Sequence, residues 1–186
     1  MIGHLLIFLH LLGVVVLAGA VALELVTLLS ARSAHTVEAA RTALAPARFI
    51  SPMAPIAALV ILASGLAMAG RIGLFGRAWV ILSIVMWLGD AIISESVTGR
   101  RMRHAAQLAA TEPEMTPALR SALTDRGMTF SCLVAAGMLG SFLYLMSSRP
   151  GWTGSLTGLI VGVAAGLVAA ALVLRRPSRQ AQPAVD

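Results

Sequence analysis

Apolar residues are concentrated in five stretches of the chain, each long enough to cross a lipid bilayer as a helix. A hydrocarbon core of about 30 Å needs roughly 20 residues at about 1.5 Å each. The pattern predicts spanning helices at residues 2–29, 52–69, 78–97, 128–147 and 155–174. Pro52 and Pro55 are expected in the first turn of the second helix, where the amides have no partner to lose.

These five stretches predict an all-α, polytopic membrane helix bundle. We expect one transmembrane domain over residues 1–174 and a disordered cytoplasmic tail over residues 175–186. The fifth stretch is rich in Gly and Ala, so we expect it to cover a four-helix core. The polar stretch 98–127 is expected to form helical turns on either side of Pro113 and Pro117.

The arginines between the apolar stretches predict the orientation of the bundle. Residues 31–51, 98–127 and the tail together hold 11 arginines, whereas the other two connections hold 3. Because cytoplasmic loops of membrane proteins are enriched in Lys and Arg, this asymmetry predicts an N-terminus outside and a C-terminus in the cytoplasm. The expected location is the cytoplasmic (inner) membrane of a bacterium, as a multi-pass protein.

Composition agrees with a membrane protein and excludes several other classes. Hydrophobic residues make up 58% of the chain, charged residues 12%, and the mean hydropathy is +0.88. The formal charge of +6 comes from arginines beside apolar stretches, so the lipid bilayer, and no nucleic acid, is the expected partner. The sequence contains no phosphate-binding loop, dinucleotide fingerprint, zinc-protease motif or serine-hydrolase motif, and we assign no catalytic residue.

The first apolar stretch carries polar residues on one helical face. His10, Gly13, Leu17, Ala20 and Glu24 follow a spacing of three and four residues, so we expect this stripe to face a neighbouring helix. His10 lies about 12 Å from the outer end, and an imidazole at that depth needs a ligand or a hydrogen-bond partner. Glu24 lies near the cytoplasmic interface, where an arginine is the expected partner.

The third apolar stretch carries a carboxylic acid beyond its midpoint. Asp90 shares a face with Ser83, Met86 and Ser94, and it must be paired, protonated or hydrated. Its role remains open between a hydrogen bond that joins helices and a functional role as a proton relay or in positioning a ligand. Met86 lies at about the same depth as His10. A thioether and an imidazole suit Cu(I) or haem, so His10 is a candidate metal ligand and Met86 a candidate partner.

Two segments resemble a known group of membrane proteins. They are "FLHLLGVVVLAGA", with its early histidine and small residues, and "LASGLAMAGRIGLFGRAWVILSIVMWL", with a Ser-Gly pair, a Gly-rich connection and a Trp that opens a helix. The pattern resembles an uncharacterised bacterial family of predicted integral membrane proteins. That family is similar in helix pattern to copper-resistance-D-like proteins and to membrane-bound protoporphyrinogen oxidase. The resemblance implies a four-helix core in which His10 ligates haem b or faces a metal pathway.

Three functions remain open at this point. The first is a redox-accessory protein that binds haem b or copper through His10. The second is a small-solute or ion permease, or its accessory subunit, with Asp90 and Glu24 along a polar path. The third is a structural scaffold that assembles as a homo-oligomer or with another membrane protein, in which His10 only bonds across helices.

Overall fold

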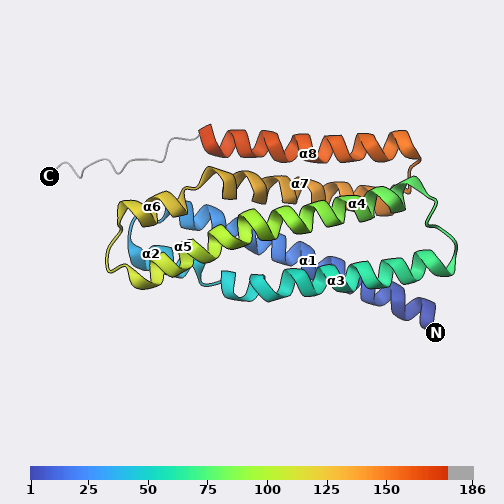
Figure 1. Cartoon of the computed structure of the whole chain (residues 1–186), viewed down its shortest axis with the longest axis horizontal. Coiled ribbons are helices and arrows are strands. Elements are labelled where there is room, and N and C mark those ends of the chain that lie inside the picture. The colour runs from blue at the N-terminus through green and yellow to red at the C-terminus, as the bar shows by residue number, and fades with distance from the viewer. Residues whose placement is uncertain (176–186) are drawn as a thin grey trace.

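The computed structural model describes residues 1–175, apart from the side chain of Ser51, as a bundle of helices (Figure 1). The elements in chain order are α1 (Ile2–Ser33), α2 (Val37–Leu44), α3 (Ala47–Arg71), α4 (Ala78–Ile93), the π-helical segment η1 (Ser94–Gly99), α5 (Arg100–Thr111), α6 (Pro117–Leu123), α7 (Arg126–Ser148) and α8 (Trp152–Arg175). No strand occurs within these described residues. The tail predicted to be disordered lies, from residue 176 onward, outside them.

Five helices are long and apolar enough to cross a membrane, which confirms the five predicted spans. The expected position of the prolines is wrong, because α3 begins at Ala47 and both Pro52 and Pro55 lie inside it. The helix starts earlier because the amides of Phe49 and Ile50 already bond to the carbonyl of Pro46. Each proline inside the helix then removes one backbone donor without ending the helix.

Two of the helical rods are longer than a bilayer is thick. From Ala78 to Thr111, α4, η1 and α5 run as one rod of 34 residues, which corresponds to about 51 Å. A bilayer is only about 40–45 Å thick, including its headgroups. One end of the bundle must therefore project from the membrane, and α1, with 32 residues, projects at the same end.

The projecting end is a helical cap with its own hydrophobic core. We use "cap" for α2, α5, α6 and the adjoining ends of α1 and α7. Its core contains apolar side chains from all of these helices: Leu28, Val37, Leu44, Met102, Ala105, Leu119, Leu123 and Met128. The helical turns expected on either side of Pro113 and Pro117 are confirmed, since α5 ends at Thr111 and α6 begins at Pro117. Stretch 98–127 is thus built into a folded layer.

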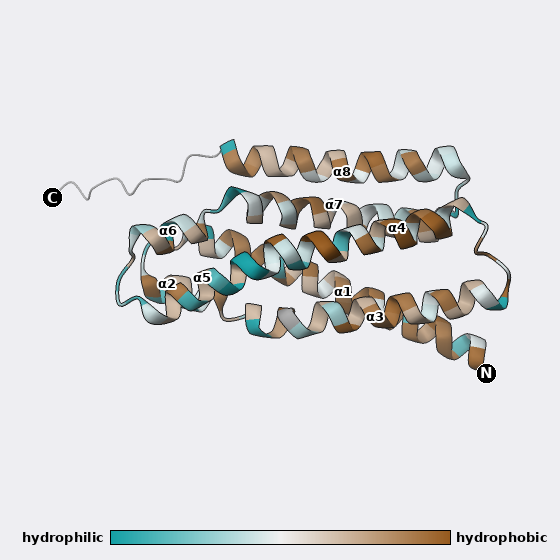
Figure 2. Ribbon diagram, in the orientation of Figure 1, coloured by the Kyte–Doolittle hydropathy of each residue, from teal (hydrophilic) through white to brown (hydrophobic). Residues whose placement is uncertain are grey.

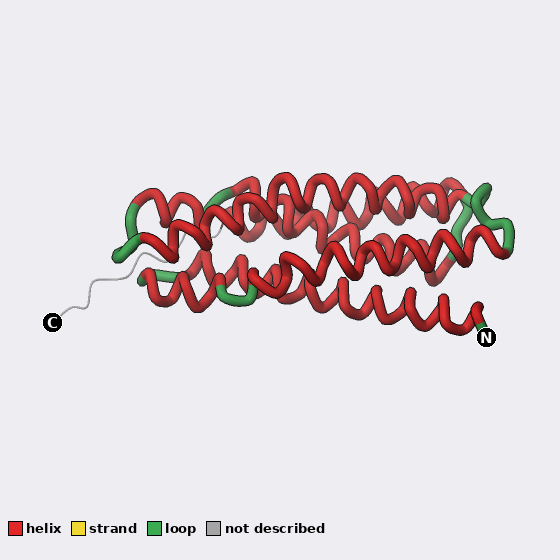
Figure 3. The backbone as a smooth tube through the Cα atoms, turned by 60° about the horizontal axis from the view of Figure 1, so that its bottom comes forward, coloured by secondary structure: helices red, strands yellow, loops and turns green. Residues whose placement is uncertain are grey.

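The spanning helices pack in two groups. α1 lies along α3, and α7 lies along α8 with α4 against it, while α1 and α7 join the groups (Figure 1). The connections lie at the two ends of the bundle (Figure 3). Between the ends the helix surfaces are largely apolar (Figure 2), and side chains such as Val15, Val85 and Ile160 are at least 59% exposed. These surfaces suit lipid contact.

Candidate functional site

His10 is half-buried on α1 and turns its ring toward α3. Its Nδ1 lies 3.0 Å from the carbonyl oxygen of Ile61 and 3.1 Å from the hydroxyl oxygen of Ser64. Because a carbonyl only accepts hydrogen bonds, the bond to Ile61 requires that Nδ1 carries the proton. In the neutral ring Nε2 is then the nitrogen with a free lone pair. No hydrogen bond to Nε2 is formed within residues 1–175.

Two glycines let α1 and α3 approach closely at this point. A Cβ added at Gly13 would lie 2.7 Å from the Cγ1 of Ile61 and 3.3 Å from the carbonyl oxygen of Ala57. A Cβ added at Gly65 would lie 3.2 Å from the Cε1 of His10. The stripe that begins with His10 and Gly13 therefore faces a neighbouring helix, as predicted. Neither glycine can gain a side chain without moving the ring or the helices.

The partner helix of His10 was not predicted from residue types alone. Ser64 is buried inside the second apolar stretch, where its hydroxyl also bonds to carbonyls of its own helix. The signal in the sequence is the Ser-Gly pair in an otherwise apolar segment. In such a pair the Ser can form a hydrogen bond with a polar side chain of another helix, and the Gly leaves room for that side chain.

The structure does not bring Met86 to His10. Met86 is buried in a cluster with Met138 and Leu145, between α4 and α7, whereas His10 packs against α3. No group of three or more His, Cys, Asp or Glu residues that could hold a metal ion occurs within the described part of the chain. His4 is exposed near the start of α1. His10 therefore stands as a single candidate ligand in the spanning region.

Glu24 and Asp90 lie within range of each other's charge, although they belong to different helices. Glu24 on α1 and Asp90 on α4 are both half-buried, and they lie close enough for their charges to interact. Ser94 lies one helical turn further along on the same face. Within residues 1–175 the ion pairs are Arg101 with Asp125 and Arg103 with Glu95. The arginine expected to pair with Glu24 is thus not found.

Further polar groups line the interior near this acid pair. Thr27, one turn from Glu24, is 1% exposed, and its hydroxyl has no hydrogen-bond partner among the described residues. The buried hydroxyl of Thr98 donates to Ser131 across the helices. α4 also changes to the π-helical η1 directly after Ile93. π-helical turns occur frequently at functional sites, so this region combines an acid pair with an irregular helix.

The comparisons with known proteins identify one family. The family described as "Predicted integral membrane protein (DUF2269)" matches residues 4–150, a range that includes His10, Glu24 and Asp90. The matched range covers α1 to α7 and ends before α8. No curated protein and no solved structure matches the chain.

Proposed function

The chain belongs to the DUF2269 family of predicted integral membrane proteins, and from that premise we propose that it binds haem b through His10 and acts as a redox-accessory protein. The observation that carries the proposal is the bond between Nδ1 of His10 and the carbonyl of Ile61. Histidines that ligate metals almost always donate their other ring nitrogen to a carbonyl, a carboxylate or water. The bacterial inner membrane is part of the proposal.

The residues around His10 fit an axial haem ligand better than a copper site. Haem iron can be held by a histidine, whereas Met86, the expected second ligand of a copper site, packs against α7 and not against His10. Ile61 and Ser64 hold the ring so that Nε2 is the free nitrogen. Gly65 keeps the helix surface beside the ring clear. A bound haem would supply reversible one-electron transfer.

The test is an absorption spectrum of the full chain purified in detergent after expression with ample haem. We expect a Soret band that changes with dithionite, together with stoichiometric iron. His10→Ala should lose both, and His4→Ala, which changes an exposed histidine of the same helix, should retain them. A wild-type protein without haem, or a His10→Ala variant with an unchanged spectrum, would refute the proposal.

A rescue experiment separates loss of the ligand from loss of the fold. His10→Gly leaves a space beside Gly65, and added imidazole is expected to occupy it and restore the spectrum in part. The variant should elute from size exclusion like the wild type. If a folded variant binds haem equally well with and without imidazole, another residue is the ligand.

A second candidate function has its own support. Glu24 and Asp90 are both half-buried and lie within electrostatic reach of each other inside the bundle. Two carboxylic acids in a low-dielectric interior cannot both ionise without a compensating cation. We therefore propose, as the alternative, a permease or accessory subunit in which this pair holds a proton or a small cation.

Proton flux in proteoliposomes that contain a pH-sensitive dye tests this alternative. Asp90→Asn and Glu24→Gln should each abolish a flux that the wild type supports. The matched control is Glu95→Gln, because Glu95 is exposed and paired with Arg103. If all four proteins give the same flux as empty vesicles, or if the two acid variants conduct like the wild type, the permease alternative fails.

A further inference from the structure

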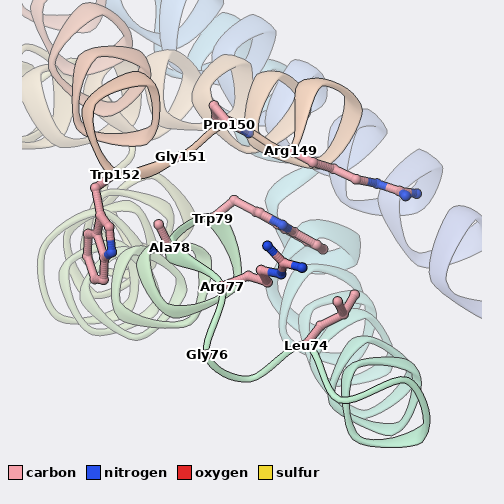
Figure 4. Close-up of a pocket in the computed structure, with 9 residues that line it drawn as sticks. All are labelled: Leu74, Gly76, Arg77, Ala78, Trp79, Arg149, Pro150, Gly151 and Trp152. Atoms are coloured by element: carbon pink, nitrogen blue, oxygen red, sulfur yellow. The ribbon is translucent and has the colours of Figure 1, made fainter.

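A pocket of about 430 Å³ opens at the end of the bundle opposite the cap (Figure 4). It lies between the connection from α3 to α4 and the connection from α7 to α8. The lining residues come from both connections and from the first residues of α4 and α8: Leu74, Gly76, Arg77, Ala78, Trp79, Arg149, Pro150, Gly151 and Trp152. Two distant parts of the sequence thus form one site.

The lining carries positive charge without a compensating acid. Arg77 and Arg149 contribute guanidinium groups, and no Asp or Glu lines the pocket. Neither arginine belongs to an ion pair within residues 1–175. Figure 4 shows the Arg77 side chain beside Trp79, whereas the Arg149 side chain extends away from Arg77. Both side chains are exposed, so each can turn toward an anion at the mouth of the pocket. Unpaired guanidinium groups at a pocket favour an anionic ligand with several oxygens.

The two tryptophans indicate the depth of the pocket in the membrane. Trp79 is at the start of α4, and Trp152 begins α8. Indole rings are enriched at the level of the lipid headgroups. The pocket therefore opens where phosphate groups of phospholipids are found, and where a soluble anion could also reach it.

We propose that this pocket binds a phosphate oxyanion through Arg77 and Arg149. The ligand is the phosphate of a phospholipid headgroup or free phosphate, because both present the same oxygens to the two guanidinium groups. The starting amides of α4 and α8 add partial positive charge beside the pocket. The site is separate from His10 and from the acid pair, so it does not depend on the proposed function.

Binding is measured on the full chain with two probes. Native mass spectrometry counts retained phosphatidylglycerol, and a thermal-shift titration uses inorganic phosphate. Loss of a charged hydrogen bond weakens affinity by about tenfold, so Arg77→Gln with Arg149→Gln should lose most of the binding. Arg71→Gln is the matched control, because Arg71 ends α3 nearby but does not line the pocket.

A second variant guards against a loss of fold. Arg149 has φ 47° and ψ 50°, a left-handed conformation that glycine adopts without strain. Arg149→Gly is therefore expected to fold at least as well as the wild type and still bind about tenfold more weakly. Lipid retention that depends on the arginines identifies a headgroup site, and a phosphate shift that depends on them identifies a free-anion site. Binding of neither probe, or equal binding by wild type and Arg149→Gly, overturns the proposal.

Discussion

Asp125 sets the residue at which α7 begins. Its carboxylate accepts a hydrogen bond of 2.7 Å from the amide of Met128 and another from the guanidinium of Arg101. Partial burial raises the pKa of Asp125, but these two hydrogen bonds lower it by a larger amount. The pKa of Asp125 therefore lies below the usual value. The Asp125 side chain therefore serves as the N-cap of α7 and also joins α7 to α5.

Replacing this N-cap residue should destabilise the protein by an amount that depends on pH. Loss of an N-cap costs about 1 kcal/mol, so Asp125→Ala should lower the free energy of unfolding by at least that amount at neutral pH. Because folding depresses the pKa, the stabilisation is present above the unfolded pKa of about 3.9 and is lost as the pH falls through the folded value.

Thermal unfolding in detergent across a pH series measures this effect. The difference between wild type and Asp125→Ala should shrink toward acidic pH. Glu114→Ala provides the control, since Glu114 is exposed in the connection between α5 and α6 and forms no ion pair within residues 1–175. A difference that stays constant from neutral to acidic pH would show that the carboxylate does not act through its charge.

At the residue scale, the sequence predicts which polar residues are costly to place inside a membrane, but it does not predict which residues they contact. His10 and Asp90 were identified because polar groups inside a membrane are expensive. Met86 was paired with His10 because the two lie at the same depth, but depth does not specify which helices are neighbours. Packing places Met86 against α7 and His10 against α3. Ser64 was therefore missed as the partner of His10, and Asp90 as the neighbour of Glu24.

At the scale of elements, small residues hold α8 against α7. A Cβ added at Gly162 would lie 2.6 Å from the carbonyl oxygen of Gly137, and one at Gly166 would lie 2.7 Å from that of Leu133. The hydroxyl of Ser141 donates to the carbonyl of Gly158 at 2.8 Å. Because the hydrophobic effect does not hold helices together in lipid, van der Waals contacts at this close approach stabilise the pairing of α7 and α8.

Enlarging one of these glycines should push the two helices apart. Gly162→Ala should destabilise the protein by about 1–3 kcal/mol, because the new methyl group meets backbone atoms that cannot rotate away. Gly140→Ala is the matched control, since a Cβ there meets no atom within 4 Å. Equal unfolding temperatures for the two variants in detergent would contradict the packing of α7 against α8.

The limits of the spans were harder to predict than their number. Each apolar stretch continues as a helix into polar sequence, where hydropathy gives no signal. In α5, Met102, Ala105 and Ala109 lie on one face and enter the cap core, but the arginines around them made the stretch resemble a solvated connection. These three residues become part of a core only because α1, α2, α6 and α7 pack against them in the cap.

At the scale of the whole molecule, five spans place the start of α1 and the end of α8 at opposite ends of the bundle (Figure 1). The arginine-rich stretches 31–51 and 98–127 meet in the cap, whereas Arg77 and Arg149 lie at the other end, where both line the pocket. The described bundle thus has one strongly basic end, with the eight arginines of the two stretches, and one weakly basic end. The positive-inside rule then predicts that the cap faces the cytoplasm.

Cysteine labelling in intact cells tests this orientation. Cys132 is the only cysteine and is buried, so Cys132→Ala provides a background without accessible thiols. In that background, Gly76→Cys adds an exposed thiol at the end opposite the cap, and Glu114→Cys adds one between α5 and α6 of the cap. A membrane-impermeant maleimide should label Gly76→Cys from outside the membrane that holds the protein, and Glu114→Cys only after that membrane is opened. The reverse labelling pattern would place the cap outside. The arginines would then stabilise the folded cap, and they would not determine the direction in which the protein inserts.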